Sequence, residues 1–578
     1  MLIFDVECFK NYFLVLCKDT DSGKIFEIKT ADEFKKLAKD NIFVSFNGIR
    51  FDELLIRLWL NGANEKLLKN ACNAIIQDNM RSSDFYNEFA CDKVTKINHI
   101  DLIEVCPGKG GLKLYGARWH CKTIAELPFS PDKELTDKEK QEVKLYCGND
   151  LEVTHLLFNK LEKQIQLRRN MSNQFKLDLR SKSDAQIAET IISNKIGRIP
   201  ASIKSQPDFI YKMPAFIQFE TSQLNKLKQK LSTELFEILQ NTVKPPEILK
   251  EQLMIGKIKY TVGMGGLHSN EKSVNFKADK EYFLVDADVA SYYPAIILNQ
   301  GLYPERLGPK FLEVYKGLVD ERLHAKKSGN KADADSLKIV INGSFGKLGS
   351  IYSKLYAPDL LIQVTITGQL ALLMLIERIE LAGIQVVSAN TDGIVIKCRW
   401  SRSDLLNEII AKWEKDTQFE MEKSEYSELY SRDVNNYIAI KLDKSVKIKG
   451  CFKPGDWQKN PNMEICAEAI IEFLVNKIPI EETIRECTDI TKFLTLRTVN
   501  GGTTDGNKII RWYHAKKIYT ELKYKTSGNK VPNSFGAKQC LTIPKLFPLD
   551  IDYQYYVTET KKMLNSIGIK SIGQMELL

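Results

Sequence analysis

The most informative stretch of this chain is Phe283-Leu284-Val285-Asp286-Ala287-Asp288-Val289-Ala290-Ser291-Tyr292-Tyr293-Pro294. An apolar run ends in carboxylates and a turn of small residues, and a second apolar segment opens at Pro294. The pattern predicts a buried strand that ends in an acid, with a helix starting after Pro294. A carboxylate at a strand end, beside backbone carbonyls, suits a hard divalent cation such as Mg²⁺. Most aspartates in this setting only form turns or cap helices, so the stretch does not define a site by itself.

Composition limits the class of protein. A chain of 578 residues should hold roughly three or four domains. Lys plus Arg exceed Asp plus Glu by 83 − 74 = 9, a basic excess that suits a polyanionic partner. Met1–Val6 is typical of a strand rather than a signal peptide, and Glu377 and Arg378 end the apolar run Leu370–Ile376, so we expect no membrane segment. The cysteines form no C-x-x-C pair. We expect a soluble, cytoplasmic protein.

A second pair of acids lies near the start of the chain, in Leu2-Ile3-Phe4-Asp5-Val6-Glu7. The apolar pattern predicts a strand, and the spacing of two places Asp5 and Glu7 on the same face of it. Acids within an apolar strand are costly unless a cation pairs with them. Asp5 and Glu7 are therefore candidate metal ligands.

Two further acids follow along the chain. Asp52 comes after a short apolar strand and a loop, just before a helix predicted from Glu53 to Leu60. Tyr146 and Asp150 lie one helical turn apart and share a helix face. Four carboxylates from such elements can hold two Mg²⁺ ions, which clamp the attacking and leaving oxygens of a phosphodiester. Tyr146 could orient the attacking water, whereas we interpret the strand-end acid Asp101 as structural.

These segments resemble the proofreading exonuclease signature of family B DNA polymerases in residue type and order. The matching residues are Asp5-x-Glu7, Asn47 to Phe51-Asp52, and Tyr146-x-x-x-Asp150. The resemblance implies a ribonuclease-H-like 3′–5′ exonuclease domain over residues 1–165. It implies that Asn47 contacts the frayed primer end, that Tyr146 assists the water, and that the metal ligands are Asp5, Glu7, Asp52 and Asp150.

The stretch that ends at Pro294 resembles the first polymerase motif of the same family, Asp-x-x-Ser-Leu-Tyr-Pro, with Tyr292 in the leucine place. The resemblance implies that Asp288 binds the catalytic metal ions together with the backbone carbonyl of Val289. The ring of Tyr293 would reject a ribose 2′-hydroxyl by contact. Asp286 is out of register with the motif, so we expect it to support the site without binding metal.

The segment Val386–Ile396 has apolar residues on both sides of Asp392-Gly393, which is a strong hairpin signal by itself. It lies where the third family motif, Tyr-x-Asp-Thr-Asp-Ser, belongs. Asp392 matches the acid that binds metal in the family, while Asn390 replaces the other acid and Gly393 replaces the serine. The loss of one negative charge predicts weaker metal affinity, although Asp288 and Asp392 can still bridge two cations.

The segment Val319–Leu348 predicts two helices separated by Ser328-Gly329-Asn330. Arg322 and Lys326 lie at i and i+4 on the first, and Lys338 lies in the otherwise apolar second. Cations on two facing helices form a phosphate clamp, although a solvated charged hairpin has the same pattern. The second helix resembles the family's second motif, Lys-x-x-x-Asn-Ser-x-Tyr-Gly. The resemblance implies that the incoming dNTP contacts Arg322, Lys326, Lys338, Asn342, Tyr293 and Phe345.

Other stretches suit contact with DNA. Gly265 and Gly266 allow close approach of a nucleic-acid backbone and match a family Tyr-x-Gly-Gly motif, with Gly263 in the tyrosine place and Tyr260 as a candidate substitute. Asn435-Asn436-Tyr437 lies where family members have Lys-x-Tyr at the primer end, and Lys441 or Lys449 could replace the missing lysine.

The stretch from Arg497 to Lys538 holds nine Lys or Arg residues, interleaved with Trp512, Tyr513 and other aromatics including Tyr519. Such a pattern suits neutralisation of a DNA backbone and stacking on bases, although a plain surface face remains an alternative. The expected DNA contacts are Asn47, Gly265, Gly266, Tyr437, Lys449, Arg511, Lys516 and Lys517.

The predicted fold class is a multidomain α+β protein, with the exonuclease domain followed by a right-hand polymerase. Residues 166–259 are predicted to be a helical connector that includes an amphipathic helix from Leu224 to Leu239. A helix from Tyr555 to Leu564 closes the last domain. The predicted polymerase domains are palm over 260–310 and 356–453, short fingers over 311–355, and thumb over 454–578.

The spacing of the motifs distinguishes branches of the family. About forty residues separate Pro294 from Lys338, and about as many separate Gly346 from Asn390. The chain resembles the protein-primed branch in compactness, but neither gap has room for that branch's insertions. We therefore expect priming from an ordinary 3′-end and limited intrinsic processivity, with a processivity factor as a candidate partner. The compact layout resembles that of viral or mobile-element enzymes.

The predicted function is template-directed addition of dNTPs to a primer 3′-OH by a monomer, with proofreading. Its substrates are primer–template DNA and dNTPs, and its cofactors are two Mg²⁺ per active site, for which Mn²⁺ can substitute. Two alternatives stay open. One is a 3′–5′ exonuclease with an inactive or weakened polymerase half, because of Asn390, and the other is a non-catalytic nucleic-acid-binding protein.

Overall fold

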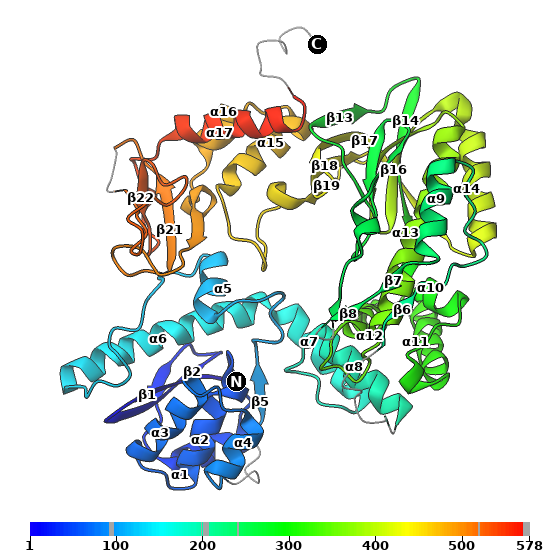
Figure 1. Ribbon diagram of the computed structural model, residues 1–578. Coiled ribbons are helices and arrows are strands. Elements are labelled where there is room, and N and C mark those ends of the chain that lie inside the picture. Colours follow the sequence, from blue (N-terminus) through cyan, green and yellow to red (C-terminus); the bar gives the residue numbers. More distant parts are fainter. Residues whose placement is uncertain (92–96, 198, 200–206, 240–241, 518–520, 570–578) are drawn as a thin grey trace. The chain divides into compact units, whose positions relative to one another are not determined.

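The computed structural model describes residues 1–578 except 92–96, 198, 200–206, 240–241, 518–520 and 570–578 (Figure 1). The chain packs into two compact units, and each unit is built from three separate segments. Both units contain helices and sheets, so the prediction of a multidomain α+β protein is confirmed. The boundaries of the predicted functional domains stay predictions. Unit 1 is 1–183, 454–465 and 486–555, and unit 2 is 184–453, 466–485 and 556–578.

Unit 1 contains a five-stranded sheet in which β1 pairs with β2 antiparallel and with β4 parallel. Because side chains alternate along a strand, Leu2, Phe4 and Val6 pack into one core while Ile3 and Phe9 pack into another. In sheet order the strands are β3 (Ile25–Glu27), β2 (Tyr12–Asp19), β1 (Leu2–Phe9), β4 (Phe43–Ser45) and β5 (His99–Asp101).

Helices cover both faces of this sheet. One face packs on α1 (Ala31–Asp40), α2 (Asp52–Leu60) and α3 (Glu65–Ile76). The other packs on α6 (Asp137–Lys160), which begins with a capping box between Thr136 and Glu139. Asp5 and Glu7 alternate with Val6, so they lie on the α6 side. The remaining helices of residues 1–183 are α4 (Ser82–Glu88), α5 (Leu112–Arg118) and α7 (Glu162–Phe175).

A second sheet of unit 1 is formed by β20 (Thr495–Thr498), β21 (Ile509–His514) and β22 (Ala537–Gln539). It packs against the first segment through Ala117, Cys121, Val153 and Leu496. Arg118 of the first segment also holds residues 454–465 of the same unit. Arg118 donates to the Trp457 carbonyl at 2.6 Å and to the Asn460 side chain at 2.9 Å.

Unit 2 is organised around a ten-stranded sheet. β14 (Tyr282–Val289), which contains Asp286 and Asp288, lies inside it between β16 and β17. The other strands are β10 (Gln252–Ile255), β11 (Ile258–Thr261), β12 (His268–Ser269), β13 (Val274–Lys277), β15 (Gln385–Asn390), β16 (Gly393–Arg399), β17 (Met421–Asp433), β18 (Asn436–Lys441) and β19 (Val446–Lys449).

The helix α13 (Pro358–Leu381) passes through the core of unit 2. By length and composition it could cross a membrane, but 83% of its most apolar window is buried inside the protein, as in the core helix of a globular unit. The other helices are α8 (Asp184–Ile196), α9 (Ser222–Leu231), α10 (Tyr292–Asn299), α11 (Lys310–Lys327), α12 (Lys331–Leu348), α14 (Ser403–Thr417), α15 (Glu464–Asn476), α16 (Ile480–Glu486) and α17 (Tyr553–Ser566).

The structure confirms the local predictions at the two helices α11 and α12, at the β15–β16 hairpin and at α17. The predicted helix Leu224–Leu239 is wrong beyond Leu231, where α9 ends. The Ser232 hydroxyl donates to the Lys228 carbonyl at 2.8 Å and caps the last turn. The chain then forms a short strand, β7 (Leu235–Phe236), because the Phe236 ring stacks on Phe209 with ring centroids 5.4 Å apart.

Candidate functional site

Two acids of unit 2 come together where β14 meets the β15–β16 hairpin. In the sheet Asp288 lies opposite Gly393 on β16 and opposite Glu422 on β17. The Val289 amide donates to the Asp392 carbonyl at 2.8 Å, which holds the hairpin turn against the end of β14. The predicted pair Asp288 and Asp392 is therefore adjacent in space.

Gly393 makes this approach feasible. A Cβ atom at Gly393 would lie 1.8 Å from Asp288 Oδ1, so no larger residue fits there unless the carboxylate moves. The turn before it holds Thr391 at φ 54°, in the left-handed region. The glycine at position 393, where the motif that this segment resembles has a serine, thus has a steric reason.

Asn390, which replaces the family's other acid, is engaged in local hydrogen bonds. Its side-chain nitrogen donates to the Val434 carbonyl at 3.3 Å, and its oxygen accepts from the Thr391 hydroxyl at 3.1 Å. A carboxylate would place an acceptor against the Val434 carbonyl. The amide therefore suits this position better than the acid does.

Asp286 is buried and held by two side chains. Lys447 Nζ lies 2.7 Å from Asp286 Oδ2, and the Tyr426 hydroxyl donates to the same oxygen. The ammonium also lies 3.6 Å from Asp288 Oδ2. Asp286 thus anchors a cation beside Asp288, a role that the sequence analysis did not foresee for Lys447.

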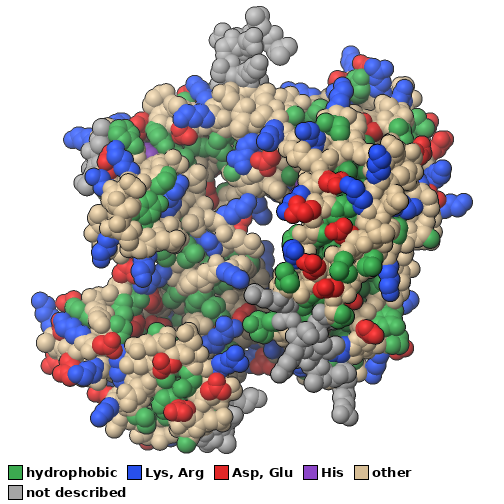
Figure 2. Space-filling model, viewed as in Figure 1, with side chains coloured by type: hydrophobic (Ala, Val, Ile, Leu, Met, Phe, Trp, Pro, Cys, Tyr) green, Lys and Arg blue, Asp and Glu red, His purple; other side chains and the backbone are tan. Residues whose placement is uncertain are grey.

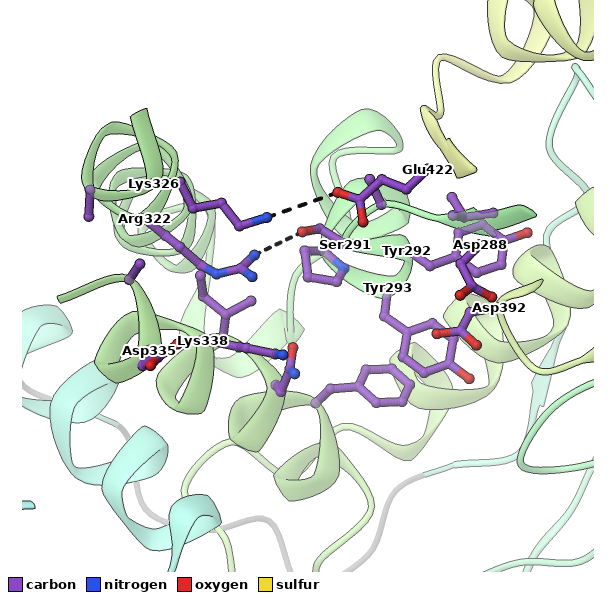
Figure 3. A pocket seen from close by; sticks show the side chains of 18 of the residues that line it. Asp288, Ser291, Tyr292, Tyr293, Arg322, Lys326, Asp335, Lys338, Asp392 and Glu422 are labelled. Carbon is purple, nitrogen blue, oxygen red and sulfur yellow. Dashed lines mark hydrogen bonds and ion pairs between the residues drawn. The ribbon is translucent and has the colours of Figure 1, made fainter. Parts of the chain in front are cut away.

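A cavity of about 760 Å³ opens beside these acids (Figure 3). Its lining includes the turn from Asp288 to Pro294, the facing sides of α11 and α12, and Asp392. Figure 3 shows Arg322, Lys326 and Lys338 on the helix side, with Asp288 and Asp392 across the cavity. Cations and carboxylates from four elements therefore share one space.

The polar contacts in this cavity orient its basic side chains. Arg322 donates to the Ser291 hydroxyl at 3.0 Å, and Lys326 Nζ lies 4.0 Å from a carboxylate oxygen of Glu422. Ser291 has φ 49° and precedes α10. Lys338 and Asn342 are exposed to the cavity.

The rings of Tyr293 and Phe345 stack, with centroids 4.2 Å apart and an interplanar angle of 26°. The Tyr293 hydroxyl donates to the Gly265 carbonyl at 3.2 Å. This contact joins the glycine-rich loop to the cavity wall. Gly263 forms two hydrogen bonds with the Gln369 side chain on α13. Its amide donates to Gln369 Oε1, and Gln369 Nε2 donates to its carbonyl, each at 2.7 Å.

A smaller cavity of about 120 Å³ lies on the other side of the acids. Both cavities include Asp288 and Asp392 in their lining, so the two acids separate them. Tyr437, Lys447 and Lys449 line the smaller one, and Lys449 Nζ lies 5.9 Å from the centre of the Tyr437 ring.

The electrostatics of this pair suit a cation. Burial raises the pKa of Asp288, and the charges of Asp286 and Asp392 raise it further, whereas Lys447 opposes the rise. Burial also raises the pKa of Asp392. Both carboxylates would gain from an additional positive charge between them.

A second cluster of acids lies in unit 1, between β1 and α6. Ligand atoms of Asp5, Glu7 and Cys147 all lie within 4.8 Å of one another. Asp52, in the first turn of α2, reaches β1 and accepts from the Val6 amide at 3.2 Å. Asp150 is buried, and its Oδ1 atom has no hydrogen-bond partner among the described residues. The structure thus brings together all four predicted acids.

The negative charges of these acids repel one another, which destabilises the ionised form of each carboxylate. Burial raises the pKa of Asp5, and the nearby charges of Asp52 and Asp150 raise it further. Burial and the charge of Asp5 do the same to the pKa of Glu7. Burial also raises the pKa of Tyr146, and the nearby charges of Asp150 and Glu7 raise it further. An unpartnered buried carboxylate oxygen beside three further carboxylates fits a hard divalent cation.

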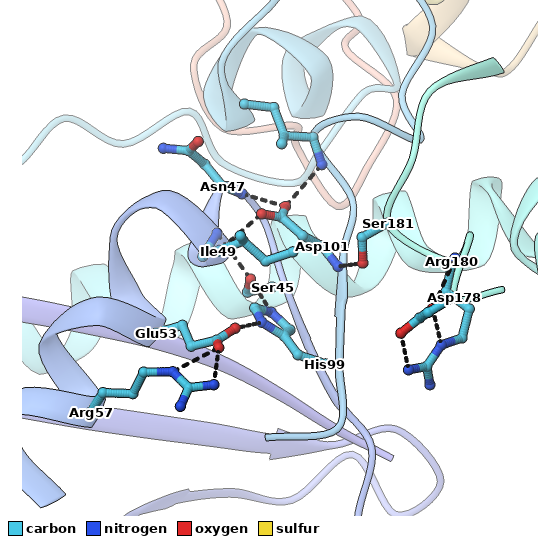
Figure 4. Close-up of polar contacts among 12 residues, drawn as sticks. Ser45, Asn47, Ile49, Glu53, Arg57, His99, Asp101, Asp178, Arg180 and Ser181 are labelled. Atoms are coloured by element: carbon cyan, nitrogen blue, oxygen red, sulfur yellow. Dashed lines mark hydrogen bonds and ion pairs between the residues drawn. The ribbon is translucent and has the colours of Figure 1, made fainter. Parts of the chain in front are cut away.

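The loop that contains Asn47 is fixed by side chains of β5 (Figure 4). Asp101 accepts from the backbone amides of Asn47 at 2.7 Å, Ile49 at 3.0 Å and Ile103 at 3.1 Å, in agreement with the structural interpretation. Asn47 itself has φ 67°, in the left-handed region.

The neighbouring residue of β5, His99, bonds to Ser45 at 2.8 Å and to Glu53 at 2.7 Å. The resemblance of this trio to a hydrolytic triad is geometric only, because Ser45 and His99 are buried. Ser45 Oγ also accepts from the Gly48 amide at 3.1 Å. The trio therefore holds the loop in place.

Some predicted DNA contacts need correction. Arg511 is fully buried, and its guanidinium donates to the carbonyls of Cys540, Cys121 and Leu541, each at 2.9 Å, so it is a structural residue. Trp512 and Tyr513 are buried as well and cannot stack on bases in this state.

Tyr260 is fully buried, so its side chain is not available as a substitute for the tyrosine of the Tyr-x-Gly-Gly motif. Lys516 and Lys517 are exposed, and Tyr519 lies outside the described residues. On the face shown in Figure 2, Lys and Arg side chains are interspersed with Asp and Glu, in line with the modest net charge of +9.

Three residues near the two acid clusters were not predicted. Lys447 reaches Asp288, and Glu422 lies opposite Asp288 in the pairing of β14 with β17. Lys113, on α5, lies 5.2 Å from the centre of the Tyr146 ring and lowers the pKa of Glu7 against the effect of burial. No local sequence pattern signals any of these approaches, because each depends on pairing between distant segments.

Comparison with known proteins gives two findings besides the absence of any matching family model. The chain is 25% identical over 201 residues to DNA polymerase 1 of Aeropyrum pernix, which covers 28% of this chain and 21% of that relative. The match thus spans about one fifth of the relative's length. The solved structure of the family B DNA polymerase from the hyperthermophilic archaeon Pyrobaculum calidifontis aligns with 99% of this chain and 78% of its own, at 13% identity and a TM-score of 0.43. The sequence match confirms the predicted resemblance to DNA polymerases.

Proposed function

We propose that this chain is a family B DNA polymerase that extends a primer 3′-OH on a DNA template and edits with a 3′–5′ exonuclease. The observation that carries the proposal is the convergence of Asp288 and Asp392 with three cations of α11 and α12 on one cavity. The similarity to DNA polymerase 1 of Aeropyrum pernix supports it. Because that match covers a fifth of the relative, the activity of the whole chain rests on the sites themselves.

In the polymerase site the acids and the cations have separate roles. Asp288, Asp392 and the Val289 carbonyl would hold two Mg²⁺ ions, which activate the primer 3′-OH and neutralise the leaving pyrophosphate. Arg322, Lys326 and Lys338 bind the triphosphate through charge-assisted hydrogen bonds and align it for in-line attack. The basic side of the cavity suits the triphosphate of a dNTP, and the acidic side suits the metal ions at its reacting phosphate.

Base and sugar are selected by the stacked pair Tyr293 and Phe345. Asn342 and Phe345 pack under the nascent base pair, and the Tyr293 ring leaves no room for a ribose 2′-hydroxyl. The bond from Tyr293 to the Gly265 carbonyl fixes the ring in this position. The glycine loop then offers the backbone of Gly265 and Gly266 to DNA.

The smaller cavity is the seat of the primer terminus. Tyr437 and Lys449 contact the last phosphate of the primer, in place of the missing family lysine. Lys447, held by Asp286, balances the charge of Asp288 when no metal ion is bound. The cavity adjoins the acids on the side away from α11 and α12.

The acid cluster of unit 1 performs editing. Asp5, Glu7, Asp52 and Asp150 would hold two Mg²⁺ ions, which would supply Lewis-acid activation of a water and of the phosphodiester. Tyr146 positions the water, and Asn47 contacts the frayed 3′-end. Proofreading removes a mispaired nucleotide because such an end frays more readily than a paired one.

The remaining expectations belong to this proposal. The enzyme acts as a cytoplasmic monomer, starts from an ordinary 3′-end, accepts Mn²⁺ in place of Mg²⁺, and has limited processivity without a partner factor. Lys516 and Lys517 contribute DNA contacts. The compact layout suggests a virus or mobile element as the source of the chain.

The decisive experiment uses Asp288→Asn and Asp5→Asn side by side, on a labelled primer–template with Mg²⁺. We expect Asp288→Asn to lose primer extension and keep degradation without dNTPs, and Asp5→Asn to do the reverse. The second candidate, a nuclease with a weakened polymerase half, is motivated by Asn390. It predicts no extension by the unaltered protein, while a non-catalytic binding protein predicts neither extension nor degradation.

A further inference from the structure

A cysteine lies inside the acid cluster of unit 1. Cys147 follows Tyr146 on α6 and is fully buried. Its Sγ atom lies 3.4 Å from Asp5 Oδ2 and 3.9 Å from the Asp5 carbonyl oxygen. Together with Glu7, these groups place a sulfur and several oxygens within 4.8 Å of one another. The proposed two-metal mechanism gives the sulfur no role.

The spacing of these atoms matches a shared metal ion. A tetrahedral Zn²⁺ with bonds of about 2.3 Å to sulfur and about 2.1 Å to oxygen separates the two ligand atoms by about 3.6 Å. The Cys147 thiol donates to Asp5 Oδ2 at 3.4 Å, so the two atoms already lie close to that separation. A cation could therefore bind both atoms with little movement of β1 or α6.

A second observation also points to a cation here. Asp150 lies at i+3 from Cys147, on the same side of α6. Its buried Oδ1 atom has no hydrogen-bond partner among the described residues. A buried carboxylate oxygen left in this way costs free energy unless a ligand satisfies it.

The sulfur changes which cation the cluster prefers. Mg²⁺ takes oxygen ligands, whereas thiolates select thiophilic metals such as Zn²⁺. Cadmium(II) shares this preference. The Cys147 sulfur, at a distance suited to a shared metal ion, therefore favours Zn²⁺ or Cd²⁺, which the carboxylates alone would bind more weakly.

We propose that the acid cluster of unit 1 is also a binding site for a thiophilic divalent cation, Zn²⁺ or Cd²⁺, held by Asp5, Glu7 and Cys147, which blocks 3′–5′ degradation. The inhibitory effect rests on the proposed editing function, whereas the binding site does not. On binding, the Cys147 S–H bond breaks, its proton passes to solvent and a metal–sulfur bond forms. No electron is transferred.

The polymerase site offers a contrast within the same chain. Among the described residues that line its two cavities there is no cysteine or histidine. Its acids, Asp288 and Asp392, present oxygen alone. Primer extension should therefore tolerate concentrations of Zn²⁺ or Cd²⁺ that stop degradation.

The first test is a Cd²⁺ titration of the intact protein in thiol-free buffer, followed by the ultraviolet charge-transfer absorption of the cadmium–sulfur bond. We expect the unaltered protein to bind one more equivalent of Cd²⁺ with this absorption than Cys147→Ser does. The matched control is Cys398→Ser, a buried cysteine on β16 in unit 2, which should keep this equivalent. Equal absorption by the unaltered protein and Cys147→Ser would overturn the proposal.

The second test measures degradation of a labelled primer with Mg²⁺ and increasing Cd²⁺, relative to each variant's own rate without Cd²⁺. Half-inhibition of Cys147→Ser should need at least tenfold more Cd²⁺ than half-inhibition of Cys398→Ser. If Cys147→Ser does not fold, Glu7→Gln keeps the thiol and should weaken the absorbing site, and an unchanged Cd²⁺ affinity would contradict the ligand set. A protein that degrades no primer but shows the Cys147-dependent absorption would refute editing and keep the metal site.

Discussion

The space between Gly393 and Asp288 is too small for one methyl group. A Cβ atom would lie 1.8 Å from Asp288 Oδ1, so Gly393→Ala must displace the carboxylate or the hairpin. Displacement of a metal ligand by about 1 Å can cost on the order of 10²-fold in rate. We expect Gly393→Ala to lower the rate of primer extension by at least that factor and to leave primer degradation unchanged.

The matched control is Gly317→Ala. Gly317 lies within α11, and a Cβ atom there would meet nothing within 4 Å. Alanine favours a helix interior over glycine by about 1 kcal/mol, so this variant should extend primers normally and melt no lower than the unaltered protein. Extension by Gly393→Ala at the unaltered rate would show that Asp288 can move without loss of function.

Asp286 and Asn390 show how neighbours of a site are determined. Asp286 shares the strand face of Asp288, yet its carboxylate is occupied by Lys447 and Tyr426. Asn390 occupies a position where the motif that this segment resembles has an acid, and its amide donates to the Val434 carbonyl. In both cases the hydrogen-bond partners, rather than the position in the sequence, determine whether the side chain is available to bind a metal ion.

At the scale of elements, the loop between β4 and α2 depends on Asp101. Its carboxylate accepts three backbone amides, including those of Asn47 and Ile49. An amide has one oxygen, and its NH₂ group would face at least one of these donors. Asp101→Asn should therefore cost about 1–3 kcal/mol of local stability.

We expect Asp101→Asn to reduce the rate of primer degradation, because the loop positions both Asn47 and Asp52, and to spare primer extension. The control is Asp178→Asn, which removes the charge of a 64% exposed carboxylate paired with Arg180 and should cost little stability. A parallel loss of extension and degradation in Asp101→Asn would indicate global unfolding rather than a local effect. Thermal unfolding of both variants distinguishes the two outcomes.

Elements with strong local patterns could be predicted from the sequence. The alternating acids of β1, the Asp-Gly turn before β16 and the break between α11 and α12 each depend on a few neighbouring residues. The order of the acids along the chain also identified both clusters. These features need no knowledge of the fold.

Features that depend on distant partners could not be predicted. Arg511 lies in a basic, aromatic stretch typical of a DNA-binding surface. In the structure its guanidinium is buried and donates a hydrogen bond to the carbonyl of Cys121, 390 residues away. Lys447 reaches Asp286 over 161 residues. The helix predicted to run to Leu239 ends at Leu231 because Phe236 finds a ring partner in Phe209. Tertiary contacts override local propensity in all three cases.

At the scale of the whole molecule, the acid clusters make stability depend on pH and metal ions. The pKa of Asp5 is raised in the folded state by burial and by Asp52 and Asp150. The folded protein therefore binds protons more tightly than the unfolded chain does. Without metal ions the free energy of unfolding should fall as pH rises from about 4, the ordinary carboxyl value, through the raised pKa.

We expect the melting temperature in EDTA to be lower at pH 8 than at pH 5.5, and Mg²⁺ to raise it at pH 8. At a hundredfold excess over Kd the gain is about 2.7 kcal/mol, or roughly 5 to 10 °C for a unit of this size. Asp5→Asn should melt higher than the unaltered protein in EDTA at pH 8 and respond less to Mg²⁺.

The control is Glu88→Gln, which removes an exposed carboxylate of α4 and should melt like the unaltered protein. A lower melting temperature of Asp5→Asn in EDTA at pH 8 would show that the carboxylate is compensated by groups other than a metal ion.

The threading of the chain through unit 1 has a consequence for synthesis on the ribosome. Residues 1–183 pack with segments that end at residue 555, so 372 further residues must be translated before the unit is complete. At 5–20 residues per second this takes roughly 20 to 75 s. During that interval Arg118 lacks its hydrogen-bond partner Trp457, and Cys121 lacks its partner Arg511. The nascent first segment of unit 1 is thus a natural client for chaperones, and unit 1 is completed only after the strand that contains Asp288 has been synthesised.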